Sequence, residues 1–236
     1  MDEPPSRDAM AAAATAPARV WDLPTRLFHW VLAATVLCSV VSAKIGGNAM
    51  VWHFRFGYVV FTLLVFRLVW GLIGGHWSRF ASFLHAPSTL RRYLSGRHTP
   101  DEHLEVGHSP VGALSVFALL GLLALQVGTG LIGDDEIASR GPLNRLVSGE
   151  TASLATGWHE SWGQYLILAM IALHIAAIVH YLVRKNLNLI GPMIHGDKPV
   201  PPGAPVSADG SGTRLVALAL LAACASLVSY VVQLGG

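Results

Sequence analysis

The sequence is poor in charged residues for a chain of its size. Asp, Glu, Lys and Arg make up 13% of the 236 residues, which is about half of the share found in soluble domains. Apolar residues account for 53%, so the composition favours an integral membrane protein. The formal net charge is only +2, and it gives no indication of a nucleic-acid partner.

Cysteine is also scarce, and this scarcity excludes several kinds of site. Cys38 and Cys224 both lie inside apolar runs, which argues against a structural disulfide and against a zinc site. The sequence contains no C-x-x-C-H motif. Covalent attachment of a c-type haem is therefore excluded.

The N-terminal segment lacks the pattern of a signal peptide. Residues 1–20 are rich in Ala and Pro, without a basic start followed by a strongly apolar stretch. We therefore expect residues 1–20 to form a disordered cytoplasmic tail.

Five apolar segments approach the length of a bilayer span. A hydrocarbon core about 30 Å thick needs roughly 20 helical residues. We predict an all-α membrane protein in which a four-helix transmembrane bundle (21–198) is followed by a linker (199–213) and a fifth, C-terminal transmembrane helix (214–236). The five segments are 26–43, 53–73, 110–132, 159–183 and 215–234.

Basic residues are distributed unevenly between the two sides of these spans. Eleven lie on the side of the N-terminus: Arg7, Arg19, Arg26, Arg79, Arg91, Arg92, Arg97, Arg184, Lys185, Lys198 and Arg214. Four lie on the other side: Lys44, Arg55, Arg140 and Arg145. Because positive charge remains in the cytoplasm, we predict a cytoplasmic N-terminus and an external C-terminus.

Four histidines lie within or at the ends of the spans: His29, His53, His159 and His174. An ionisable group at membrane depth is costly and indicates a functional site. His159 and His174 are separated by about four helical turns plus 60°, with a rise of about 22 Å. They therefore share a face but cannot bind the same ion, whose ligands lie about 2 Å away.

We therefore predict two sites, one pairing His29 with His174 near the cytoplasmic face and one pairing His53 with His159 near the outer face. Two facing neutral imidazoles suit a six-coordinate haem iron. Gly57 and Gly163 each follow an outer histidine by four residues, and we expect them to leave room for a porphyrin edge. For any single histidine, a hydrogen-bonded contact between helices remains an alternative.

Arg67 and His108 are further candidates for cofactor binding. Arg67, within the second span, can pair with a haem propionate or extend its side chain to the membrane surface. His108, at the start of the third span, can contact a propionate or a quinone, or cap the helix. Both alternatives stay open.

The order of several short motifs resembles the bacterial cytochrome b561 family, which includes the b-type cytochrome subunit of nickel-iron hydrogenases. The motifs, within roughly residues 20–198, are VWDLPTRLFHW, WHFRFG, FRLVWG, GHSPVG and, after His159, LHIAAIVHYLVRKNLNLIGPMIHG. The resemblance implies a four-helix bundle holding two b-type haems, with His29, His53, His159 and His174 as ligands. Two features depart from the family pattern: the fifth span lies beyond the family core, and the loop before His53 is short.

The resemblance also implies electron transfer with the quinone pool (ubiquinone or menaquinone). A hydrogenase or a soluble cytochrome is the implied partner, in the bacterial inner membrane. The favoured function is thus transmembrane electron transfer between quinone and a redox partner in a respiratory chain. One alternative is a stand-alone quinone or superoxide oxidoreductase, so enzymatic activity stays open. Another is a cofactor-free transporter or structural subunit.

Overall fold

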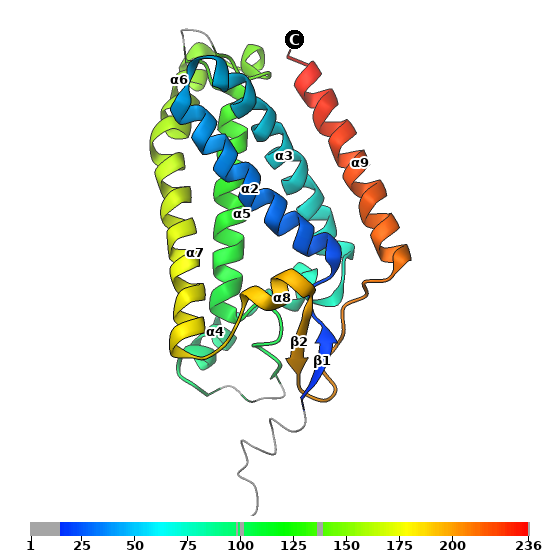
Figure 1. Cartoon of the computed structure of the whole chain (residues 1–236). Coiled ribbons are helices and arrows are strands. Elements are labelled where there is room, and N and C mark those ends of the chain that lie inside the picture. Colours follow the sequence, from blue (N-terminus) through cyan, green and yellow to red (C-terminus); the bar gives the residue numbers. More distant parts are fainter. Residues whose placement is uncertain (1–14, 98, 100–101, 136–138, 236) are drawn as a thin grey trace, which may run out of the picture.

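The computed structural model describes residues 15–97, 99, 102–135 and 139–235. Within this part of the chain, five helical segments are long and apolar enough to cross a bilayer, which confirms the predicted all-α membrane fold (Figure 1). They are α2 (Leu23–Ile45), α3 (Met50–Ile73), α5 (Pro110–Ile132), the composite segment Gly149–Arg184 and α9 (Ser211–Gln233).

The composite segment consists of three parts with different helical geometry. It starts with α6 (Gly149–Gly157), continues through the π-helical turn η6 (Trp158–Gly163) and ends with α7 (Gln164–Arg184). A π-turn contains one residue more per turn than an α-helix and is commonly found at functional sites. His159 lies in this turn.

Short elements connect the spans at both ends of the bundle. The 3-10 turn η1 (Gly47–Ala49) joins α2 to α3. At the opposite end lie the 3-10 turns η2 (His76–Ser78) and η3 (Phe80–Ser82), with the helices α4 (Pro87–Leu94) and α8 (Ile190–His195). A further 3-10 turn, η5 (Asn144–Leu146), precedes α6.

The helices begin where side-chain caps are available. Asp22 accepts a hydrogen bond from the Thr25 amide, and Pro24 occupies the first turn of α2, as is favourable at a helix start. The Asp22 carboxylate is fully buried and also accepts hydrogen bonds from the Gly75 amide and the Ser78 hydroxyl. One carboxylate thereby joins the start of α2 to the end of α3.

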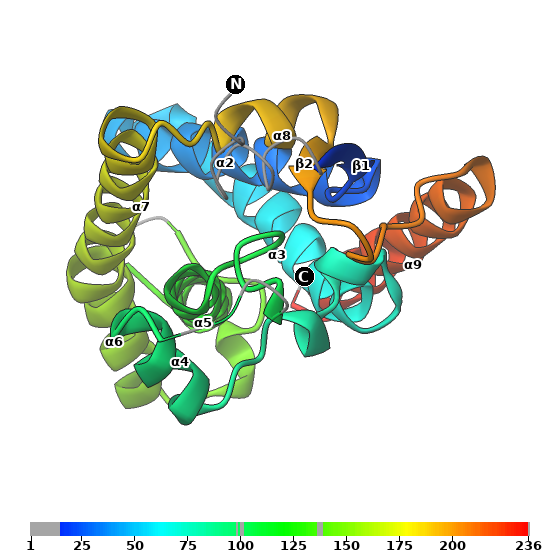
Figure 2. The same ribbon diagram turned by 90° about the horizontal axis from the view of Figure 1, so that it is seen from below.

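Two apolar clusters of the core lie among the long helices. One lies among α2, α3, α5 and α7 and contains Val36, Val60, Leu64, Leu123 and Ile167. The other joins α9 to α2 and α3 through Phe28, Leu63, Phe66, Trp70, Ala217 and Cys224. Figure 2 shows α9 on the far side of α3 from α7, so the fifth span is attached to one flank of the four-helix bundle.

The prediction of a disordered tail is wrong for residues 16–20. Strand β1 (Ala16–Arg19) pairs in antiparallel register with β2 (Asp197–Val200), and Val20 is fully buried. The amides of Val20 and Trp21 donate to the Gly196 carbonyl. The partner strand lies far away in the sequence, which is why local composition could not indicate it. The same prediction for residues 1–14 lies outside the described residues.

The segment predicted as a linker, residues 199–213, has ordered ends and contacts the start of α2. Pro199 and Val200 belong to β2, and α9 already begins at Ser211. The Ser207 hydroxyl donates to the Val20 carbonyl at 2.7 Å. This segment therefore fixes the N-terminal end of α9 to the bundle.

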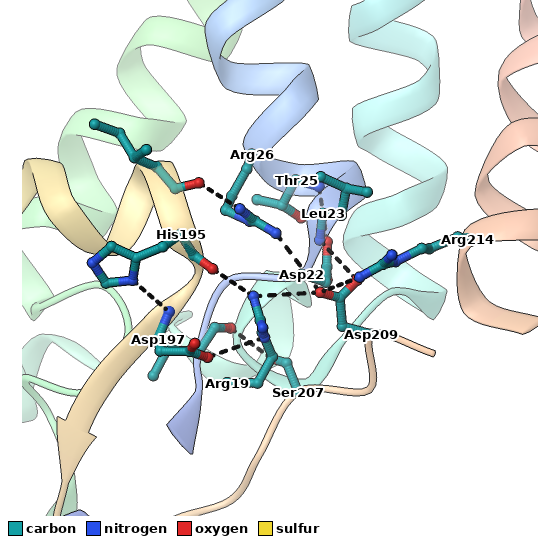
Figure 3. Close-up of polar contacts among 12 residues, drawn as sticks. Arg19, Asp22, Leu23, Thr25, Arg26, His195, Asp197, Ser207, Asp209 and Arg214 are labelled. Atoms are coloured by element: carbon teal, nitrogen blue, oxygen red, sulfur yellow. Dashed lines mark hydrogen bonds and ion pairs between the residues drawn. The ribbon is translucent and has the colours of Figure 1, made fainter. Parts of the chain in front are cut away.

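Asp209 is the centre of this attachment (Figure 3). Its carboxylate accepts from the Leu23 amide at 3.0 Å and from Arg214 Nε at 3.1 Å. Arg19 Nη1 and Arg26 Nη2 lie 3.6 and 3.8 Å away. Burial acts to raise the pKa of Asp209, but the hydrogen bonds from Arg214 and Leu23 outweigh it and lower that pKa.

Candidate functional site

The four span histidines form two pairs at the two ends of the bundle. We call His53 and His159 the outer pair, and His29 and His174 the inner pair. The ring centroids of the outer pair are 5.8 Å apart with planes at 88°. Those of the inner pair are 6.4 Å apart with planes at 53°. The pairing inferred from helical phase and depth is therefore the pairing found in three dimensions.

Both outer histidines have a defined tautomer. His53 Nδ1 lies 2.9 Å from the Ser39 carbonyl, and His159 Nδ1 lies 2.9 Å from the Gln126 carbonyl. A carbonyl oxygen can only accept, so each Nδ1 carries the proton and each Nε2 keeps its lone pair. This arrangement is typical of metal-binding histidines.

The outer pair opens into a cavity of about 510 Å³ among α2, α3, α5 and η6. Its floor is apolar and includes Val36, Val60, Leu123 and Ile167. Its rim is polar and includes Lys44, Asp134, Ser139 and Glu160. An apolar slot with a charged rim suits a flat hydrophobic cofactor that carries polar substituents.

The two glycines predicted to leave room for a porphyrin edge behave differently. Gly57 lines the cavity, and a Cβ atom built on it meets no other atom within 4 Å. At Gly163 a Cβ would lie 2.0 Å from Gln126 Oε1, so the prediction for Gly163 is wrong. The i, i+4 argument assumed α-helical phase, whereas His159 and Gly163 both lie in a π-turn.

The inner pair joins α2 to α7. Trp30, next to His29, donates to the Met193 carbonyl of α8, the short helix at one end of the bundle in Figure 1. His174 lies further from the end of α7 than His29 lies from the start of α2. Because α7 continues to Arg184, the two rings can still lie at the same depth. His29 Nδ1 is buried and finds no hydrogen-bond partner among the described residues. Its ring stands edge-on to Trp30 at 5.0 Å.

Arg67 is buried and does not extend to the surface, so that alternative is wrong. Its side chain is 3% exposed, donates to the Ser78 carbonyl at 2.9 Å and lies over the Phe80 ring at 4.7 Å. It also faces the ring of Phe28, the residue before His29, at 5.9 Å. The guanidinium is therefore held at the end of the bundle where α2 begins, the end of the inner pair.

His108 does not cap α5, since the Ser109 hydroxyl accepts from the Gly112 amide in that role. The His108 ring packs against Trp21 at 4.7 Å and Phe83 at 4.5 Å. Burial, and then the positive charge of Arg67, lower the pKa of His108 to about 3. It is therefore a neutral imidazole close to Arg67.

Each pair of rings fits one metal ion between two nitrogen ligands. Two imidazoles that bind one ion at about 2 Å have ring centres roughly 6 Å apart, in agreement with 5.8 and 6.4 Å. Among the described residues, no group of three or more His, Cys, Asp or Glu is placed to hold an ion. Each pair thus offers two axial imidazoles, which is the ligand set of a six-coordinate haem.

A family model described as prokaryotic cytochrome b561 matches residues 20–196. The chain belongs to this family. It is therefore a b-type cytochrome that binds haem b and transfers electrons in a membrane. Family membership argues against the cofactor-free transporter or structural subunit considered above.

Curated relatives support the same conclusion. A probable Ni/Fe-hydrogenase B-type cytochrome subunit of Azotobacter vinelandii is 28% identical over 213 residues, covering 75% of this chain and 86% of the relative. The probable Ni/Fe-hydrogenase 1 subunit of Escherichia coli K12 is 23% identical, covering 75% and 88%. A Cupriavidus necator subunit is 24% identical, covering 75% and 85%. No solved structure matches. The family match ends at residue 196, before α9.

Sequence reasoning missed the residues that hold the outer histidines. Ser39 and Gln126 act through their main-chain carbonyls, which any residue type possesses. Gln126 nevertheless carried a signal, because an amide side chain in the apolar span 110–132 needs an internal hydrogen-bond partner. The π-turn carried no signal in the hydropathy pattern.

Proposed function

We propose that the chain is a di-haem cytochrome b that conducts electrons across the bilayer between the quinone pool and a redox partner. His53 and His159 hold one haem, and His29 and His174 hold the other. The observation that carries this proposal is the meeting of four imidazoles in two pairs at opposite ends of one bundle. Two haems at different depths of one membrane would let an electron cross it in successive transfers.

The imidazoles determine what each site does. When bound, haem iron supplies reversible one-electron redox chemistry. The two histidines of each pair would both be ligands of the bound haem iron, so that no position would be left for oxygen or another substrate. The Nδ1 hydrogen bonds of His53 and His159 orient their rings and increase the basicity of Nε2. These features favour electron transfer over catalysis at the iron.

Arg67 and His108 complete the inner site. The guanidinium of Arg67 retains donors beyond its bond to the Ser78 carbonyl and can pair with a carboxylate substituent of the inner haem. His108 is a neutral donor or acceptor beside it, suited to a propionate or to a quinone carbonyl. We place the quinone, ubiquinone or menaquinone, in contact with the chain on the basis of the family resemblance.

The partner and the orientation follow from the relatives and from charge. Relatives are named as hydrogenase subunits, so a hydrogenase is the redox partner that we propose. The excess of Lys and Arg on the side of the inner pair supports a cytoplasmic location of that side, and of the N-terminus, in a bacterium. The membrane is then the inner membrane.

Loss of haem from single variants tests the assignment. We expect His53→Ala and His159→Ala to lose one and the same haem, and His29→Ala and His174→Ala to lose the other. Haem per purified chain should fall from two to one, and redox titration should show which of two midpoints disappears. His180→Ala, at an exposed position of the same helix α7, is the control and should keep both. A wild-type chain with a single haem would contradict the proposal, as would a variant of either pair that retains both.

A further inference from the structure

We propose that Gln126 is a positioning residue for the outer haem. Through α5 it holds both the ring and the main chain of His159, and it thereby determines the plane in which that imidazole meets the iron. This inference rests on the proposed function, in which His159 is an axial ligand.

Two hydrogen bonds connect Gln126 to His159 in opposite directions. The Gln126 carbonyl accepts from His159 Nδ1 at 2.9 Å, and Gln126 Nε2 donates to the His159 carbonyl at 2.8 Å. The first contact sets the tautomer and the ring direction. The second fixes the backbone from which the ring projects. A single residue of the neighbouring helix therefore determines the placement of the ligand at two points.

The second contact is needed because His159 lies in the π-turn Trp158–Gly163. In such a turn i→i+5 bonds replace i→i+4 bonds, and a carbonyl at the junction with α-helix is open to a side-chain donor. In a membrane, a carbonyl without a donor is costly, since no water is available. Without Gln126, a regular α-helix would be more stable than the π-turn, because the His159 carbonyl would then regain a main-chain donor. That change would rotate His159 about the helix axis by about 100°, the angle of one residue.

Two glycines leave the space that this arrangement needs. A Cβ atom on Gly130 would lie 2.8 Å from Cε1 of the His159 ring. A Cβ atom on Gly163 would lie 2.0 Å from Gln126 Oε1. The ring and the amide thus each pack directly on a backbone that has no side chain. Thr129 Oγ1, 3.4 Å from His159 Nδ1, makes a longer third contact.

The variant Gln126→Leu tests the inference, because it keeps the main-chain carbonyl and similar bulk but removes the amide donor. The EPR spectrum of ferric haem depends on the angle between its axial imidazole planes, which is 88° here. We expect a changed EPR signal and a shifted midpoint for the outer haem only. The affinity of that site for haem should fall about 10- to 100-fold, the usual effect of losing a group that orients a metal ligand. The inner haem should keep its signal and its midpoint.

A control variant and a rescue variant make the result specific. Thr35→Val removes a partly buried hydrogen bond to the Val31 carbonyl within α2 and should leave both haems unchanged. If Gln126→Leu loses the outer haem altogether, Gln126→Glu should restore it, because a carboxylic acid kept neutral by burial offers an O–H donor. Failure of this rescue would overturn the inference.

The two proposals fail in distinguishable ways. If Gln126→Leu has the wild-type EPR signal and midpoints while His159→Ala lacks one haem, Gln126 has no positioning role but the ligand assignment stands. If His159→Ala retains both haems, the ligand assignment itself is wrong.

Discussion

At the scale of single residues, the outer site depends on close contact with backbone. His53 and His159 each direct Nδ1 to a carbonyl of a neighbouring helix. Such contacts require that the helices approach closely, which glycine permits in membrane bundles. Gly130 on α5 is such a position, since a Cβ atom there would meet the His159 ring.

We therefore expect Gly130→Ala to displace the His159 ring. The added Cβ would lie 2.8 Å from Cε1, and overpacking of this kind costs about 1–3 kcal/mol. The outer haem should be lost or shifted in a reduced-minus-oxidised spectrum, and the thermal unfolding midpoint should fall. Gly128→Ala on the same helix meets no atom within 4 Å and is the matched control. Equal spectra and equal midpoints for both variants would contradict the packing argument.

At the scale of elements, the end of the chain that carries the inner pair is held by contacts between distant segments. Strands β1 and β2 pair, the Gly196 carbonyl accepts from the amides of Val20 and Trp21, and Asp209 binds the start of α2. The Trp30 indole donates to the Met193 carbonyl in α8. Because Trp30 is next to His29, these contacts orient the region from which the inner pair projects.

Asp209→Asn tests the electrostatic part of this attachment. The change keeps an acceptor for the Leu23 amide but removes the charge that faces Arg19, Arg26 and Arg214. We expect the unfolding free energy to fall by about 1–3 kcal/mol at neutral pH, measured by thermal unfolding in detergent.

The pH dependence has a defined sign, because the pKa of Asp209 is lowered in the folded protein. Its stabilising contribution is complete above the unfolded pKa of about 3.9. It is lost as pH falls through the lower folded value. The difference between wild type and Asp209→Asn should therefore shrink below about pH 4. Glu150→Gln, at an exposed position of α6, is the control. A difference that stays constant with pH would contradict the ion-pair argument.

At the scale of the whole molecule, five spans place β1 and the end of α9 on opposite faces. In Figure 1 the C-terminus lies at the end that carries α6, and β1 lies at the other end. The inner pair is thus on the face of β1, and the outer pair is on the face where α9 ends. A transmembrane path between the pairs requires this arrangement.

Reporter fusions test the orientation. A fusion after residue 201, in the segment that follows β2, should report the cytoplasm. A fusion after residue 235, beyond α9, should report the external side. Two reporter enzymes, one active only in the cytoplasm and one active only outside the inner membrane, would measure the location of each fusion. Identical locations for the two fusions would contradict a membrane-spanning α9, and exchanged locations would contradict the proposed orientation.

Local patterns in the sequence determined the five spans and the pairing of the four histidine rings. Hydropathy and helical phase depend only on neighbours along the chain, and these suffice to give depth and face. Gly163 shows the limit of this reasoning, because one extra residue in a turn altered the phase.

Only the tertiary structure decided what meets at each position. Arg19 pairs with Asp197, Gln126 binds His159, and Arg67 turns inward to the Ser78 carbonyl. Each of these contacts joins segments whose distance in space depends on how the helices pack and where they bend. A pattern with a period of one helical turn contains no information about that packing.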